Sequence, residues 1–117
     1  MPLLKKNRLS TKDFIENKTK VGGFWHKTSI FGVKSLKNAL LDYRFGFVVG
    51  SNVSKNAVTR NLIKRRLRDI VSKNTQNIKK GFDIVIITYP PIKDVKYKNL
   101  ETELLAALKQ LRLLINA

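Results

Sequence analysis

Residues 57–68 read AVTRNLIKRRLR, and this stretch combines the period of a helix with a high density of positive charge. Asn56 stands before it and suits the N-terminal cap of a helix, which we predict from Ala57 to about Ser72. Four apolar residues of this helix share one arc of a helical wheel, and we expect them to face a sheet: Ile63, Leu67, Ile70 and Val71.

A row of cations lies beside that apolar arc. Arg60, Lys64 and Arg68 follow one another at i, i+4 and i+8. Their steps of about 6 Å along a helix axis are comparable to the spacing of successive phosphates. Ala57 and Asn61 lie next to the row, and their short side chains would let a nucleic-acid backbone come close.

Charged helix faces are most often simply solvated, but this one has an unfavourable pattern for that role. Each like-charged pair at i,i+4 costs an isolated helix about 0.2–0.5 kcal/mol, and Asp69 is the acid nearest to compensate. Arginine supplies four of the five cations between residues 60 and 68, and guanidinium binds phosphate through two parallel hydrogen bonds. Bound phosphates would offset the repulsion. Arg65 flanks the row, and Arg66 projects elsewhere.

Composition agrees with a polyanionic partner. The chain has 117 residues and a formal net charge of +16, which predicts a single basic domain over residues 1–117. Hydrophobic residues make up 43% of the chain and occur in periodic runs, so the charge does not indicate a disordered tail. Cysteine is absent, and we see neither a signal peptide nor an apolar run that would span a membrane. We therefore expect a soluble cytoplasmic protein.

The other segments predict an α+β sandwich with helices packed on a small sheet. Ser10 suits the cap of a short first helix that carries Phe14. Strands are predicted within 24–34, which allows a hairpin, and at 44–49, while residues 35–43 read as a connection. The continuous apolar run at 82–88 favours a central strand. A last helix is predicted from Asn99, with an apolar stripe that we expect in the core: Leu100, Leu104, Leu108, Leu111 and Ile115.

The helix at 57–68 resembles the signature of the protein subunit of bacterial ribonuclease P, A-x-x-R-N-x-x-K-R-x-x-R. Six residues occupy its fixed places: Ala57, Arg60, Asn61, Lys64, Arg65 and Arg68. The stretches KKNRLSTKDF, RFGFVV and FDIVIITYP are similar to the family's basic start, its R-x-G strand and its late D-x-V-x-I strand. The resemblance covers nearly the whole chain.

This resemblance implies an α-β-β-β-α-β-α fold like that of ribosomal protein S5 domain 2, with a left-handed βαβ crossover against the usual rule. It also implies an endoribonuclease subunit that binds a catalytic RNA and helps it remove the 5′ leader from precursor tRNA. Mg²⁺ would be bound mainly by the RNA, which would carry the catalysis. No membrane and no obligate protein partner are expected.

By that analogy, the signature cations and Asn61 would contact the RNA subunit, with Lys55 in the preceding turn and Arg66 as further candidates. A cleft between the first helix and the sheet would hold the unpaired leader. Phe14 and Phe31 are candidates to stack on its bases, although a core role is equally open for each. The sequence departs from the family near this cleft, for example at Lys18, where a second aromatic is usual.

Catalytic groups of the protein's own are not evident. His26 is the single histidine, and the eight carboxylates are scattered without the spacing of a two-metal nuclease site. The main alternative is a structural RNA-binding protein such as a ribosomal protein, which would share the size, charge and fold class. A DNA-binding domain is less favoured because no recognition-helix pair is evident, and a self-contained nuclease is the least favoured reading.

Overall fold

The computed structural model describes residues 3–10, 12–13 and 22–115. Its elements in chain order are η1 (Lys5–Asn7), β1 (Phe24–Lys27), β2 (Phe31–Lys37), β3 (Arg44–Val48), α2 (Ala57–Lys73), η2 (Thr75–Asn77), β4 (Phe82–Thr88), η3 (Pro90–Asp94) and α3 (Tyr97–Gln110). The predicted first helix, with Phe14, lies almost wholly outside the described residues. At its expected start, the hydroxyl of Ser10 accepts a hydrogen bond from the Asp13 N–H at 3.1 Å, as predicted for a cap.

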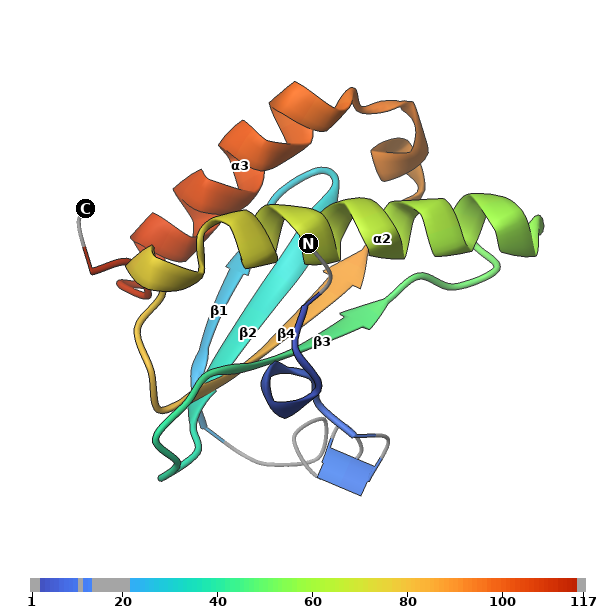
Figure 1. Ribbon diagram of the computed structural model, residues 1–117. Helices are drawn as coiled ribbons and strands as arrows, with labels where there is room; N and C mark the ends of the chain where they lie inside the picture. The colour runs from blue at the N-terminus through green and yellow to red at the C-terminus, as the bar shows by residue number, and fades with distance from the viewer. Residues whose placement is uncertain (1–2, 11, 14–21, 116–117) are drawn as a thin grey trace.

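The four strands form one sheet in the order β1-β2-β4-β3 (Figure 1). β4 pairs antiparallel with β2 and parallel with β3, so the strand predicted to be central is central. In Figure 1, β3 and β4 both point toward the upper right, β4 lies on the upper-left side of β3, and α2 crosses between them on the viewer's side of the sheet. The β3-α2-β4 crossover is therefore left-handed, as the resemblance implied.

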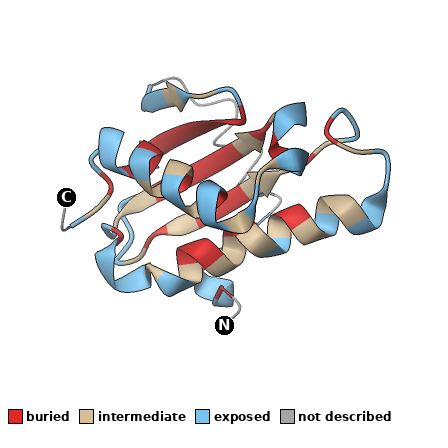
Figure 2. Ribbon diagram, turned by 90° about the horizontal axis from the view of Figure 1, so that it is seen from above, coloured by how far each residue is buried: buried red, intermediate tan, exposed pale blue. Residues whose placement is uncertain are grey.

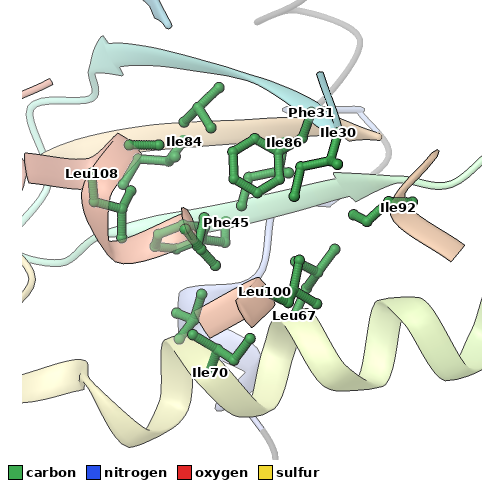
Figure 3. Packing of buried hydrophobic residues seen from close by; sticks show 14 of the residues in the cluster. Ile30, Phe31, Phe45, Leu67, Ile70, Ile84, Ile86, Ile92, Leu100 and Leu108 are labelled. Atoms are coloured by element: carbon green, nitrogen blue, oxygen red, sulfur yellow. The ribbon is translucent and has the colours of Figure 1, made fainter. Parts of the chain in front are cut away.

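Both long helices pack on the same face of the sheet, and the core lies between these two layers (Figures 1 and 2). The predicted apolar arc of α2 is confirmed, because its buried residues are those expected: Ile63, Leu67, Ile70 and Val71. Leu67 and Ile70 approach the sheet from α2, while Leu100 and Leu108 approach it from α3 (Figure 3). Strand residues Ile84, Ile86 and Phe45 meet them from the sheet, and this packing fixes the distance between the layers.

Two predicted boundaries were wrong. Residues 35–37 extend β2 instead of beginning the connection, because they pair with β4 across residues 82–84. The last helix begins at Tyr97 and ends at Gln110, so Ile115 lies beyond it and is 57% exposed. Arg112 has a φ of 57°, which ends helical geometry, and beyond it Leu113 is buried instead of Ile115.

Candidate nucleic-acid interface

The start of α2 is held by its preceding turn. Asn56 Oδ1 accepts a hydrogen bond from the Val58 N–H at 2.8 Å, which confirms the predicted cap. Ser54 Oγ accepts the Asn56 N–H at 3.1 Å. Arg60 folds back over this turn, and its Nη1 donates to the Ser54 carbonyl at 2.9 Å. The first cation of the row therefore has a defined orientation while it keeps its other donors for a ligand.

The middle cations of α2 border two grooves. The strand groove, about 320 Å³, lies between Lys64 and Arg68 of α2 and residues 45–49. The helix groove, about 860 Å³, is lined by Asn61, Arg65 and Arg68 together with the N-terminal segment. Of the predicted row, Lys64 and Arg68 therefore line the strand groove and Arg68 also lines the helix groove, whereas Arg60 lines neither. A polyanion lying over this end of the molecule would meet cations from either side.

Arg68 carries an unsatisfied donor. Its Nε is buried and has no hydrogen-bond partner within the part of the chain that the structure describes. A buried donor without an acceptor costs about 1–3 kcal/mol. A phosphate oxygen is an acceptor that suits both the charge and the fork geometry of guanidinium. Because Nε itself is buried, a ligand would reach the guanidinium of Arg68 from the two grooves that this residue lines.

Arg8 joins these grooves, although it was not among the predicted site residues. It lines both of them, and its Nε donates to the Leu3 carbonyl at 3.0 Å. The segment around it is attached to β3, because the Leu9 N–H donates to the Phe45 carbonyl at 2.9 Å. Buried Asn7 also donates to the Tyr43 carbonyl at 2.8 Å. The basic start of the chain was a sequence signal, but only these long-range bonds place Arg8 beside Arg68.

The other predicted candidates lie in different settings. Lys55 is exposed in the turn before α2, where a ligand can reach it. Arg66 is half-buried and is not among the described residues that line either groove. Phe31 is 0% exposed and belongs to the core, so the stacking role considered for it is wrong in this structure. Phe14 lies outside the described residues.

The acid closest to the row is engaged by the neighbouring helix. Asp69 accepts a hydrogen bond from the Tyr97 hydroxyl, which ties α2 to α3. Burial, and then this bond, raise the pKa of Tyr97, so its hydroxyl remains a donor at neutral pH. One turn further along, Lys73 approaches Glu101 at 3.2 Å, and the hydrogen bond to that carboxylate raises the pKa of Lys73. Asp69 therefore serves the packing of α2 on α3 as well as offsetting charge.

The R-x-G and D-x-V-x-I motifs meet across the sheet. Arg44 on β3 is the register partner of Asp83 on β4, and it donates to both carboxylate oxygens at 2.8 and 2.7 Å. Its Nη1 donates to Asp13 at 2.8 Å. The hydrogen bonds to Asp83 raise the pKa of Arg44 above its ordinary value, despite the opposing effect of burial. These motif residues therefore stabilise the fold by tying β3 to β4.

Within the described ranges, no group of three or more histidine, aspartate and glutamate side chains is arranged to hold a metal ion. Among the same residues, none of the helices has the length and apolar character needed to cross a membrane.

Comparison with known proteins gives concordant matches. The family model described as Ribonuclease P matches residues 3–112. The Ribonuclease P protein component of Natranaerobius thermophilus is 34% identical over 79 residues, which cover 68% of this chain and 68% of that protein. The component of Finegoldia magna is 48% identical over 63 residues, but that stretch spans only 51% of this chain and 56% of the relative.

Solved structures extend the likeness over most of both chains. The RNase P protein of Staphylococcus aureus superposes with a TM-score of 0.81 at 28% identity, covering 92% of this chain and 96% of that one. The RNase P protein of Thermotoga maritima gives a TM-score of 0.78 at 31% identity, with coverages of 88% and 96%. The fold and the order of elements are thus shared with these proteins.

Proposed function

The chain belongs to the ribonuclease P protein family, and from this premise we propose that it assists the endonucleolytic removal of the 5′ leader from precursor tRNA. It would do so as the protein subunit of a cytoplasmic ribonucleoprotein. The partners are a catalytic RNA and the precursor. The alternative of a structural RNA-binding protein, such as a ribosomal protein, is not favoured by the matches.

The observation that carries this proposal is the position of Arg68. Arg68 lines both the strand groove and the helix groove, with Lys64 on the first, Arg65 on the second and Arg8 on both. Guanidinium and ammonium groups on two sides of a concave surface suit a folded phosphate backbone. Contacts of this kind position an RNA without reading its sequence. Because the chain belongs to the ribonuclease P protein family, we take the bound RNA to be the catalytic RNA subunit.

In this proposal, the chemistry belongs to the RNA, and Mg²⁺ is bound mainly by the RNA. The described residues of the protein offer no cluster that fits a metal ion, so no step of the reaction is assigned to a metal on this chain. The protein contributes charge. With a formal net charge of +16, it offsets the repulsion between two polyanionic RNAs and so lowers the Mg²⁺ concentration that they need to associate.

A second contribution would be selective affinity for precursor. If the protein also contacts the unpaired leader, as the family resemblance implies, the holoenzyme should bind precursor more tightly than mature tRNA. Equal affinity for both in a filter-binding assay would remove this part of the proposal and leave the RNA-assembly part intact.

The direct test is cleavage of precursor tRNA by a bacterial ribonuclease P RNA at low, near-physiological Mg²⁺, with and without the protein. We expect the native chain to restore cleavage, and the variant Arg60→Ala/Lys64→Ala/Arg68→Ala to fail. The matched control is Lys93→Ala/Lys98→Ala/Lys109→Ala, which removes the same charge from exposed positions off α2.

Circular dichroism should show that both triple variants are folded. If neither the native chain nor the control changes cleavage, while the RNA alone still cuts at high Mg²⁺, the subunit proposal is wrong. If both triple variants lose activity equally, net charge alone is responsible and the α2 interface is not the site.

A further inference from the structure

An acid lies among the cations of the helix groove. Asp69 lines this groove together with Arg65, Arg68 and Arg8. It follows Arg65 at i+4 on α2, so the two side chains project one helical turn apart with an offset of about 40° around the axis. Side chains of opposite charge at this spacing commonly pair on a helix surface. A carboxylate in this place would therefore compete with a phosphate for the guanidinium of Arg65.

The structure does not contain this pair. Within the described part of the chain, Arg65 takes part in none of the salt bridges, and its side chain is exposed. The Asp69 carboxylate instead accepts a hydrogen bond from the hydroxyl of Tyr97, at the start of α3. The acid of the groove is thus tied to the neighbouring helix, and the cation one turn before it stays accessible to a ligand.

Tyr97 is itself held from a second side. Lys73 Nζ donates to the Tyr97 hydroxyl oxygen at 3.4 Å and lies 5.1 Å from the centre of the ring, within the range of cation–π attraction. The same ammonium group pairs with Glu101 of α3 at 3.2 Å. These contacts give the ring a defined place between α2 and α3. Removal of the hydroxyl alone would therefore release Asp69 while the ring keeps its packing.

We infer that Tyr97 is a positioning residue for RNA binding: its hydroxyl directs the Asp69 carboxylate toward α3 and so keeps Arg65 free to contact a phosphate. Without the hydroxyl, the carboxylate loses a donor, and the guanidinium one turn away is a suitable replacement. RNA would then have to displace Asp69 before it could bind Arg65. The inference rests on the proposed function for the nature of the ligand, RNA.

The first test measures the affinity of the full chain for a bacterial ribonuclease P RNA by filter binding. Tyr97→Phe should weaken binding by about fivefold at about 0.1 M salt, because one phosphate contact is lost. Asp69→Asn removes the charge but keeps an oxygen that can accept the Tyr97 hydroxyl, and affinity should stay the same or rise by up to about threefold. The double variant should bind as tightly as Asp69→Asn. This rescue is expected only if Tyr97 acts through the charge of Asp69, because lost packing would persist in the double variant.

Tyr43→Phe is the matched control. It also removes a tyrosine hydroxyl that is hydrogen-bonded to another side chain, Thr75 at 2.7 Å, but neither of these residues lines a groove. RNA affinity should not change in this variant. Equal weakening by Tyr43→Phe and Tyr97→Phe would indicate a general effect of lost stability and would overturn the inference. A double variant that binds as weakly as Tyr97→Phe would overturn it as well.

The second test needs no RNA. In the NMR spectrum of the free chain, the Nε–H signal of Arg65 reports whether a carboxylate is bound to it. We expect Tyr97→Phe to slow the exchange of this proton with water by about threefold or more, and Asp69→Asn to abolish the effect. An unchanged Arg65 signal in Tyr97→Phe would overturn the inference. If the signal changes as expected while the triple variant of α2 binds the catalytic RNA normally, the α2 interface of the proposed function fails and the coupling of Tyr97, Asp69 and Arg65 stands.

Discussion

Arg44 and Arg68 are the same side chain in two opposite settings. Arg44 on β3 donates through Nε and both terminal nitrogens to Asp83 and Asp13. Arg68 on α2 has a buried Nε with no acceptor among the described residues. The first arginine completes the fold, and the second borders the two grooves of α2. In a chain this basic, the presence of a partner says more about an arginine's role than its charge does.

The difference arises from the elements that carry them. Parallel pairing of β3 with β4 places Arg44 directly beside Asp83, and the carboxylate is shielded enough for the pair to be strong. On α2, the positions at i±4 from Arg68 are Lys64 and Ser72, so the helix itself supplies no acid along that row. We therefore expect substitutions near Arg44 to change stability and substitutions along α2 to change RNA affinity.

The largest expected effect is on stability. Asp83→Ala leaves the part-buried Arg44 without its main partner, and breaking a buried pair in this way costs about 3–5 kcal/mol. Guanidinium unfolding should show the loss as a lower midpoint. Asp94→Ala, an exposed aspartate in η3, should change stability by less than about 0.5 kcal/mol. A similar small change at Asp83 would mean that the pair is not a stabilising feature.

The next effect is on RNA affinity. Arg60→Ala/Lys64→Ala/Arg68→Ala should weaken binding to the catalytic RNA by about a hundredfold, and the slope of log K against log salt should fall by about two. The melting temperature should stay the same or rise, because like-charged pairs are removed. A large drop in melting temperature would show that this row also stabilises the fold, and the contrast with Arg44 would fail.

Replacing Arg44 or Arg68 by lysine tests the two sites more closely, because lysine keeps the positive charge but lacks the paired N–H donors of guanidinium. Arg44→Lys should lower the free energy of unfolding by about 1–3 kcal/mol without changing RNA affinity, since lysine cannot bond Asp83 through two parallel donors. Arg68→Lys should weaken RNA binding by about fivefold and leave stability unchanged or improved. Arg66→Lys is the control on the same helix. Equal behaviour of Arg68→Lys and native protein would reduce the role of Arg68 to its charge.

The smallest expected effect concerns the cap of α2. Asn56→Ala removes the acceptor of the Val58 N–H and should cost about 1 kcal/mol, measured by thermal unfolding. Asn61→Ala, an exposed asparagine inside the same helix, should not lower stability. If Asn61→Ala were the more destabilising of the two, the assignment of the helix start would be wrong.

Local patterns predicted much of this molecule. The sequence predicted which face of α2 is buried, its cap at Asn56 and the central place of residues 82–88 in the sheet. Helical periodicity, capping side chains and apolar runs can be recognised from neighbouring residues in the chain. Ile115 was wrongly predicted to lie in the core, because no local sequence signal indicates that Arg112 adopts a left-handed backbone conformation. The sequence around Phe31 does not distinguish a buried ring from an exposed one. The pairing of β2 with β4 places this ring in the core.

By itself, the sequence determined the elements, the cationic row and the family, since each depends on residue types at fixed spacing. Tertiary structure alone decided which cations act together. Arg8 lines the same grooves as Arg68 because Asn7 and Leu9 are bonded to Tyr43 and Phe45, far along the chain. Arg44 is satisfied by Asp83 because of strand order and register. The physical reason is that burial and pairing are properties of contacts between distant segments, and a charge becomes available to a ligand only where those contacts leave it unpaired.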